Sequence, residues 1–186
     1  MGIRIIVGIG NPGAAYEGTR HNLGFKVVEE ITERHTVYLS QHRFHAQADI
    51  CSITGKYAVC LKPMLFVNNS GLTVRSVLDY YNASLNDLCV VCDDVSLDSG
   101  SIRMKRAGSS GGHKGLESII KECRSDRFPR LKIGIRGGYA GDMASYVLGA
   151  YTGEERKILE EAVARAANAV ESWLHQGIEQ SMNMYN

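Results

Sequence analysis

The stretch Ile3–Gly13, IRIIVGIGNPG, decides how the rest of the sequence is interpreted. It joins a β-branched run, typical of a strand, to a cluster in which Gly8, Gly10 and Gly13 match the pattern G-x-G-x-x-G. A strand followed by such a loop is the fingerprint of a dinucleotide-binding α/β fold, in which a helix begins at the glycines. The stretch therefore leaves two alternatives: a phosphate-binding loop, or a tight loop that presents Asn11.

Segments typical of strands and helices alternate along the chain. Strands are predicted at Arg4–Val7, at 46–62 (two strands split by a turn at Thr54–Lys56), at Leu88–Cys92, at Ser101–Lys105 and at Arg130–Ile135. Apolar residues three and four apart predict helices at Leu23–Arg34, Leu72–Tyr81, Gly115–Cys123 and Thr152–His175, the last beginning with a capping box of Thr152 and Glu155. We therefore predict a single three-layer α/β domain over residues 1–186, with a mixed central sheet flanked by helices and a long C-terminal helix.

The bulk composition is that of an ordinary soluble globular protein. Of the 186 residues, 44% are hydrophobic and 22% are charged. No apolar run approaches the ~18 residues of a transmembrane helix, and the N-terminal run is far shorter than the core of a signal peptide. The five cysteines are an odd number. Without an export signal, we expect them to be reduced thiols of a cytoplasmic protein that has no membrane contact.

The net charge of +1 conceals an uneven distribution. Residues 101–136 contain ten Lys or Arg and three acidic residues, a net charge of +7, so the remaining residues carry −6. This asymmetry is typical of a surface that binds a polyanion such as a nucleic acid. The alternative is a solvated basic surface without a ligand.

The dinucleotide alternative meets three objections in the sequence. The predicted helix begins near Leu23, well after Gly13, so its N-terminus would not reach a pyrophosphate at the glycines. Glu29 and Glu30 lie near the expected acidic position but fall inside that helix. Pro12 removes one backbone N–H that the loop would need. A loop that presents Asn11 is therefore the favoured alternative.

Other phosphate and metal motifs are incomplete. The stretch 108–115, GSSGGHKG, lacks the Gly-Lys-Ser/Thr ending of a P-loop, although its glycines would let a phosphodiester backbone approach closely. Cys89 and Cys92 lie on a predicted strand with side chains on opposite faces, and no second pair completes a tetrahedral site. His42 and His45 have no nearby carboxylate. We therefore expect no metal site.

Polar side chains follow two of the predicted strands. His21 lies in the loop after the first strand, and Asp93 and Asp94 follow the apolar run Leu88–Cys92. Because strand carboxyl ends converge at one edge of an α/β sheet, His21 and Asp93 are candidates for a general base and its orienting acid. The alternatives are a surface histidine and a turn or helix cap. Asn11 and Asn68 could bind an amide or an ester, or serve only as turn and cap residues.

Three motifs are spaced along the chain. They are VGIGNPGAAYEGTRHNLGF at 7–25, KPMLFVNNSG at 62–71 and GSSGGHKGLESI at 108–119. The first resembles V-G-L-G-N-P-G-x-x-Y-x-x-T-R-H-N-x-G, the N-terminal signature of the bacterial peptidyl-tRNA hydrolase family. The second resembles that family's K-P-x-T-F-M-N-x-S-G, and the third resembles G-G-x-x-G-H-N-G-L-x-S-I. The motifs occur in the family's order and at its spacing.

The resemblance implies a function and a set of site residues. The family hydrolyses the ester between a peptide and tRNA, and its members are usually monomers that need no cofactor or obligate protein partner. By position in the motifs, His21 matches the catalytic base on water and Asp93 matches the acid that supports it. The residues at substrate-binding positions are Asn11, Tyr16, Asn68 and Lys114, the last in place of an Asn of the family. The family presents basic residues to tRNA phosphate at the positions of Arg103, Lys105 and Lys132.

The sequence departs from the family pattern at three positions. Lys114 stands where the family has Asn, Ser96 replaces a second Asp, and Leu65 replaces a Thr. Lysine donates hydrogen bonds but cannot accept them, so Lys114 cannot accept a hydrogen bond from the substrate as the amide does. Its ammonium could point towards His21 and lower the pKa of that histidine, or point outwards to tRNA phosphate. This departure also leaves open an RNA-binding paralogue with weakened catalysis.

Overall fold

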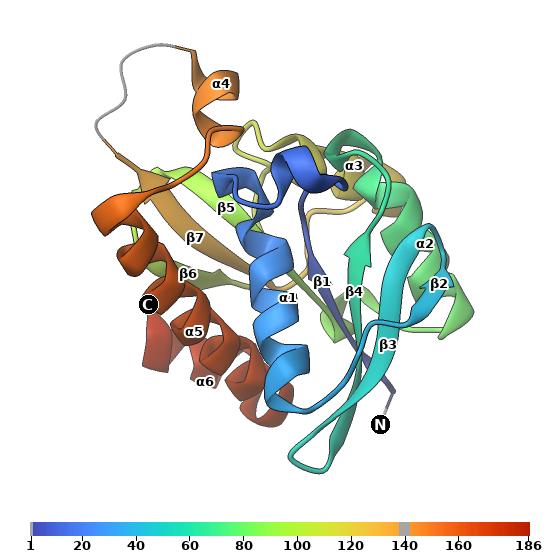
Figure 1. Cartoon of the computed structure of the whole chain (residues 1–186). Coiled ribbons are helices and arrows are strands. Elements are labelled where there is room, and N and C mark those ends of the chain that lie inside the picture. The colour runs from blue at the N-terminus through green and yellow to red at the C-terminus, as the bar shows by residue number, and fades with distance from the viewer. Residues whose placement is uncertain (1, 138–141) are drawn as a thin grey trace.

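A seven-stranded sheet organises the structure, a computed structural model that describes residues 2–137 and 142–186 (Figure 1). Its strands lie in the order β2-β3-β4-β1-β5-β7-β6. They are β1 (Arg4–Gly8), β2 (Gln41–Arg43), β3 (Ala46–Ile53), β4 (Lys56–Pro63), β5 (Leu88–Asp98), β6 (Ile102–Lys105) and β7 (Arg130–Arg136). The central strands β4, β1, β5 and β7 are parallel, and antiparallel strands complete both edges. The predicted mixed sheet is confirmed.

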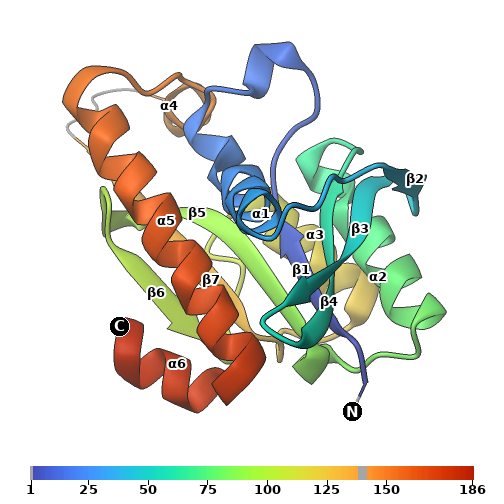
Figure 2. The same cartoon turned by 60° about the horizontal axis from the view of Figure 1, so that its bottom comes forward.

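Helices cover both faces of this sheet, which gives three layers (Figures 1 and 2). The helices are α1 (Leu23–Arg34), α2 (Ser70–Tyr80), α3 (Lys114–Cys123), α4 (Met143–Val147), α5 (Gly153–Gln176) and α6 (Ile178–Tyr185). In the described residues, short 3-10 turns precede α1 and flank α2: η1 (Ala14–Tyr16), η2 (Arg20–Asn22), η3 (Val67–Asn69) and η4 (Leu85–Asp87). One apolar cluster joins α1 and α5 to the sheet, and a second joins α2 and α3 to the opposite face.

The central strands are apolar because both of their faces are buried. In β1, Ile6 packs into the cluster with α1 and α5, while Ile5 and Val7 pack into the cluster with α2 and α3. Cys89 and Cys92 of β5 divide in the same way between the two clusters, as the spacing on a strand predicts. A strand that is buried on both faces needs a continuous apolar run, and the sequences of β1 and β5 have one.

Three glycines, at the end of β1, just after it and in the first turn of α1, allow the helix to begin close to the end of the strand. A Cβ on Gly8 would lie 2.1 Å from the carbonyl oxygen of Gly24, and a Cβ on Gly24 would lie 2.4 Å from the carbonyl oxygen of Val91. A Cβ on Gly10 would lie 2.8 Å from Oδ1 of Asn22. These contacts need residues without side chains. Since α1 begins at Leu23 and not at the glycines, Gly8 and Gly10 serve close packing and not a pyrophosphate, while Gly13 has a φ of 105° that favours glycine.

Two sequence predictions need correction. The strand predicted at Leu88–Cys92 continues to Asp98, because it pairs with β7 beyond Cys92, with Asp93 opposite Ile133. The predicted capping box of α5 is wrong: the side chain of Thr152 makes no cap hydrogen bond, and Glu155 binds Arg20 instead. The helix predicted at Thr152–His175 is observed as Gly153–Gln176, and Gly177 is its C-cap. The short elements β2, α4 and α6 were not predicted.

Within residues 2–137 and 142–186, no helix combines the length and the apolar character that crossing a membrane requires.

Candidate active site

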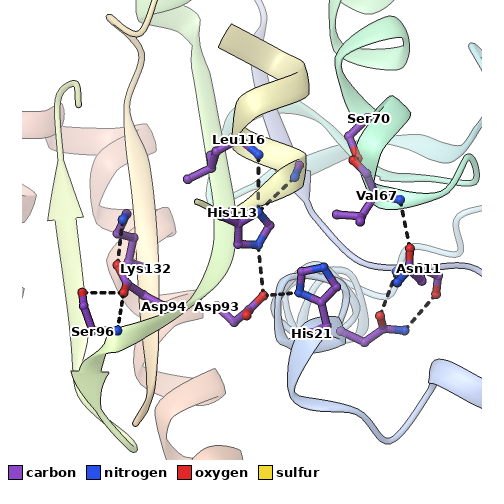
Figure 3. A network of polar contacts seen from close by, with 12 residues as sticks. Asn11, His21, Val67, Ser70, Asp93, Asp94, Ser96, His113, Leu116 and Lys132 are labelled. Carbon is purple, nitrogen blue, oxygen red and sulfur yellow. Dashed lines mark hydrogen bonds and ion pairs between the residues drawn. The ribbon is translucent and has the colours of Figure 1, made fainter. Parts of the chain in front are cut away.

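His21 and Asp93 meet at the carboxyl-terminal edge of the central strands (Figure 3). The turn η2 carries His21, and β5 carries Asp93. The Nδ1 atom of His21 lies 2.8 Å from Oδ1 of Asp93, and the two side chains are 9% and 3% exposed. The contact predicted from the strand ends is therefore present. Because Asp93 lies inside β5, it serves neither as a turn residue nor as a helix cap.

A second histidine, His113, completes this cluster. Its Nε2 lies 3.1 Å from the same Oδ1 of Asp93, and its Nδ1 accepts hydrogen bonds from the backbone N–H groups of Gly115 and Leu116 at 3.1 and 3.4 Å. Those two donors require an unprotonated Nδ1, so His113 carries its proton on Nε2 and donates it to Asp93. The imidazole centroids of His21 and His113 are 4.9 Å apart.

Sequence reasoning missed His113, although the third motif contains it. One feature of the sequence could have identified His113 as a site residue: it lies between a glycine-rich loop and a predicted helix. Histidine is not among the residues preferred at helix N-caps. As the cap of α3, His113 is held at a fixed point from which its other ring nitrogen reaches Asp93.

The cluster shifts the pKa of its members in opposite directions. Burial alone would raise the pKa of Asp93, but the electrostatic attraction of the His113 imidazole and the hydrogen bonds from His113 and His21 outweigh burial, so this pKa lies well below the usual range. Burial alone would lower the pKa of His21, but the hydrogen bond and charge of Asp93 outweigh burial, so this pKa is raised. Asp93 is therefore ionised, and it stabilises the protonated form of His21.

Asn11 fixes the loop after β1 against two neighbouring segments. Its backbone N–H donates to Oδ1 of Asn22 at 2.8 Å, and Nδ2 of Asn22 donates to the Asn11 carbonyl at 3.0 Å. Its own Oδ1 accepts from the backbone N–H of Val67 at 2.9 Å. Asn22 directly follows His21, so these bonds connect Asn11 to the turn that carries the histidine. The amide nitrogen of Asn11 makes no hydrogen bond within the described part of the chain.

The predicted substrate residues Asn68 and Tyr16 lie on the turns η3 and η1. Asn68 lies in η3, is exposed and follows Val67, which binds Asn11. Tyr16 packs edge-on against Phe66 with ring centroids 6.4 Å apart. Beside Asn11 lies a groove of about 330 Å³, whose lining includes Pro12, Gly13, Asn22, Phe25, Lys62 and Met64.

Lys114 points away from the two histidines. Its ammonium pairs with Glu117 at 3.0 Å, one turn along α3, and its side chain is 69% exposed. This placement corresponds to the outward alternative. The side chain nevertheless begins at the first residue of α3, beside His113.

The three predicted tRNA-binding residues lie on the edge strand β6 and on its neighbour β7. Arg103 stands directly opposite Lys132 in the antiparallel pair, and Lys105 shares its face of β6. Arg103 is exposed, whereas the side chain of Lys132 is 12% exposed and pairs with Asp94 at 2.7 Å. Throughout residues 2–137 and 142–186, no acidic side chain pairs with Arg103 or Lys105. We call these three residues the basic strand face.

Not every basic residue of segment 101–136 reaches the surface. Arg130 is fully buried. Its guanidinium donates to the carbonyl oxygens of Gly108 and Asp126, both at 2.6 Å, and lies over the ring of Phe128. Arg130 therefore holds the glycine-rich loop in place and adds nothing to the charged surface.

The histidine–aspartate cluster also contains the atoms of a possible metal site. The nitrogen and oxygen ligand atoms of His21, Asp93 and His113 all lie within 4.8 Å of one another. Hydrogen bonds already join each histidine to the carboxylate. These bonds account for the arrangement, and we assign no metal to it.

Fold and site together define a class of protein. A mixed α/β sheet ends in a buried His–Asp pair flanked by amides, and in the described part of the chain no serine or cysteine nucleophile is bound to that pair. Such a site is typical of a hydrolase that activates water directly.

Comparison with known proteins identifies the family. The family model for peptidyl-tRNA hydrolase matches residues 5–186. A peptidyl-tRNA hydrolase of Lachnospira eligens is 42% identical over 183 residues, which are 98% of each chain. One of Syntrophomonas wolfei is 40% identical over 184 residues, covering 99% of this chain and all of that protein. This chain belongs to the peptidyl-tRNA hydrolase family.

Solved structures agree with this assignment. The crystal structure of peptidyl-tRNA hydrolase from Acinetobacter baumannii has a TM-score of 0.92 to this fold, at 32% sequence identity. The similarity covers 99% of this chain and 94% of that one.

Proposed function

We propose that this protein hydrolyses the ester between a peptide, or an N-blocked amino acid, and tRNA, with water activated by His21. The main support for the proposal is the hydrogen bonding of the two nitrogens of the His21 ring. Its Nδ1 is engaged by Asp93 at 2.8 Å, while its Nε2 has no hydrogen-bonding partner in the described chain. A histidine held in this way presents a lone pair at Nε2 to a water molecule.

The reaction follows from that geometry. Water attacks the acyl carbon and gives a proton to Nε2 of His21, and ionised Asp93 stabilises the resulting imidazolium. The tetrahedral intermediate then collapses: the bond from the acyl carbon to the ribose oxygen breaks, and His21 returns the proton to that oxygen. The amide nitrogens of Asn11 and Asn68 are candidates to donate to the developing oxyanion or to the peptide. The products are free tRNA and a carboxylate.

His113 acts in this scheme through Asp93. Its proton on Nε2 is donated to the oxygen that also binds His21, which keeps the carboxylate ionised and in one orientation. His113 is therefore a positioning residue. It also caps α3, so one side chain couples the glycine-rich loop to the catalytic pair.

The basic strand face supports the tRNA half of the proposal. Arg103 is exposed and pairs with no acidic side chain of the described chain, so its guanidinium is available to a phosphate. Lys132, opposite Arg103, already pairs with Asp94 at 2.7 Å, and Lys105 extends the face along β6. We propose that the tRNA backbone binds here. We also propose that the chain is one domain, acts as a monomer and works in the cytoplasm, where its substrate arises.

A binding protein without catalysis is the alternative that Lys114 raised. The relatives named above are all hydrolases, and His21 and Asp93 are in place, which favours the enzyme. The test is hydrolysis of N-acetylated aminoacyl-tRNA in heavy-oxygen water, followed by mass spectrometry of both products. We expect the heavy oxygen in the carboxylate of the released amino acid. Heavy oxygen on the tRNA end, or no release of product, would contradict the proposal.

A further inference from the structure

The short turn η2 is anchored in three directions by its three residues. His21 binds Asp93 of β5, and Asn22 binds both backbone polar groups of Asn11. Arg20 points the opposite way, towards the segment that leads into α5. Neither the motif resemblance nor the proposed mechanism gives Arg20 a role.

Arg20 is held by an unusually complete set of acceptors. Its Nε and Nη2 donate to the two carboxylate oxygens of Glu155 at 2.7 and 2.6 Å, and its Nη1 donates to the carbonyl oxygens of Tyr146 and Gly149 at 3.2 and 3.1 Å. The guanidinium carbon lies 4.3 Å from the centroid of the Tyr146 ring. Only 12% of the Arg20 side chain is exposed. A bidentate, half-buried pair of this kind fixes geometry as well as charge.

The backbone around Arg20 binds the same segment. The N–H of Arg20 donates to the Gly149 carbonyl at 3.2 Å, and Thr19 forms an isolated β-bridge with Ala150. Tyr146 in turn donates its hydroxyl to the Ile135 carbonyl of β7 at 2.6 Å. The turn that carries His21 is therefore tied to both α5 and the sheet.

We propose that Arg20, through its ion pair with Glu155, is a positioning residue that sets the orientation of the His21 ring. The proposal rests on the proposed function, since it concerns the base of that reaction. One hydrogen bond to Asp93 fixes Nδ1 but leaves the ring free to rotate about that contact. Fixing the backbone of η2 removes this freedom and directs Nε2 at a single place for water.

The side chain of Glu155 also explains the capping box that α5 lacks. As the third residue of the helix, Glu155 is placed to reach back to Thr152, yet both of its oxygens are bound by Arg20. The protein thus uses the carboxylate for a long-range contact between residues that are distant in sequence. Gly149 fits this arrangement, because a Cβ there would lie 3.0 Å from Nη1 of Arg20.

The test compares Glu155→Gln and Arg20→Lys with the control Glu154→Gln. The change Glu155→Gln keeps the size of the side chain but loses one acceptor, and Arg20→Lys keeps the charge but loses the bidentate fork. Glu154 lies in the same first turn of α5 and pairs with the exposed Lys157, so it matches the chemistry without touching η2. Kinetic constants are measured on N-acetylated aminoacyl-tRNA across the titration range of histidine, and thermal unfolding identifies any variant that fails to fold.

We expect kcat to fall roughly ten- to hundred-fold in the two Arg20–Glu155 variants, with KM within about twofold, because a small misplacement of a catalytic group is costly. The acid limb of the pH–rate profile should move to lower pH, because a looser contact with Asp93 lowers the raised pKa of His21 towards its ordinary value. Glu154→Gln should match the native protein in both respects.

Two outcomes would overturn the proposal. One is a folded Glu155→Gln variant with native kcat and a native acid limb. The other is a loss confined to KM, which would give Arg20 a role in substrate binding. NMR titration of the His21 ring measures the change in the pKa of His21 without any catalysis. The His21 signal is assigned by its absence in His21→Ala. If the native protein proved inactive, the proposed function would fail, and the titration would still decide whether Glu155 acts on His21.

Discussion

The histidine–aspartate cluster and the basic strand face are both polar regions, but they are built on opposite principles. His21, Asp93 and His113 are buried and bind one another, so each has a fixed direction. Arg103 and Lys105 lie on a sheet edge and pair with no acidic side chain of the described chain. A buried network of this kind specifies geometry, whereas exposed cations supply attraction that salt screens. Changes in the first region should therefore alter kcat, and changes in the second should alter affinity.

The largest effect among the partners of His21 is expected for Asp93→Asn. The neutral amide cannot stabilise the imidazolium, and it can hold His21 in the wrong tautomer, so kcat should fall about 10²- to 10⁴-fold. The pH dependence should change as well. Activity requires neutral His21, whose pKa is raised in the native protein, so the native rate is half-maximal at a pH above that of an ordinary histidine, about 6.5. In Asp93→Asn this midpoint should move down, and kcat measured against pH checks it.

Native tRNA affinity in Asp93→Asn is the control, because the basic strand face is untouched. A variant that kept its acid limb but lost tRNA binding would contradict the separation of the two regions.

His113→Ala should have a smaller effect. It removes one of the two donors to Asp93 and also the cap of α3, so we expect roughly a tenfold loss of kcat and a loss of about 1 kcal/mol in the free energy of unfolding. His113→Asn separates the two roles, since asparagine caps helices well but is too short to reach Asp93. Denaturant unfolding should show near-native stability for His113→Asn, while kcat remains reduced. Full activity in His113→Asn would show that the hydrogen bond from His113 to Asp93 does not affect kcat and that His113 acts only as the cap of α3.

The double change Arg103→Ala and Lys105→Ala tests the other region. Affinity for tRNA should fall several-fold, and the slope of log affinity against log salt should become shallower by about one for each phosphate contact removed. Single-turnover rates at saturating protein should stay native. Lys157→Ala on α5 is the matched control, because that lysine is exposed but lies on another element. An unchanged salt slope would contradict the proposal that tRNA binds at the basic strand face.

The smallest effect is expected for Lys114→Asn, which restores the family residue. The lysine side chain pairs with Glu117 and extends into solvent, so kcat should change by no more than about twofold. Loss of the exposed pair should cost only about 0.2–0.5 kcal/mol in stability. A tenfold gain in kcat would show that position 114 contacts the substrate and that lysine there limits the native enzyme.

The sequence predicted those features that depend on local pattern. The bounds of α1 follow from its apolar spacing, and the meeting of His21 with Asp93 follows from the convergence of strand ends. The features that it did not predict depend on contacts between distant segments. Asp93 lies inside β5 because β7 continues the pairing, and Arg130 is buried because carbonyl oxygens of the glycine-rich loop surround it.

The two missed residues of the site have the same explanation. His113 meets Asp93 only after the cap of α3 has formed, and Arg20 meets Glu155 across most of the chain length. No periodicity encodes either contact. Local propensity instead favoured a capping box at Thr152, and the long-range ion pair overrides it.

The most direct test of the central claim compares the native protein with His21→Ala in single-turnover release from N-acetylated aminoacyl-tRNA, with tRNA affinity measured in parallel. The account predicts that the variant loses at least about 10²-fold in rate and binds tRNA with native affinity. A variant that releases the amino acid at the native rate would contradict the role of His21 as the base. A variant that loses rate and affinity together would contradict the division between the histidine–aspartate cluster and the basic strand face.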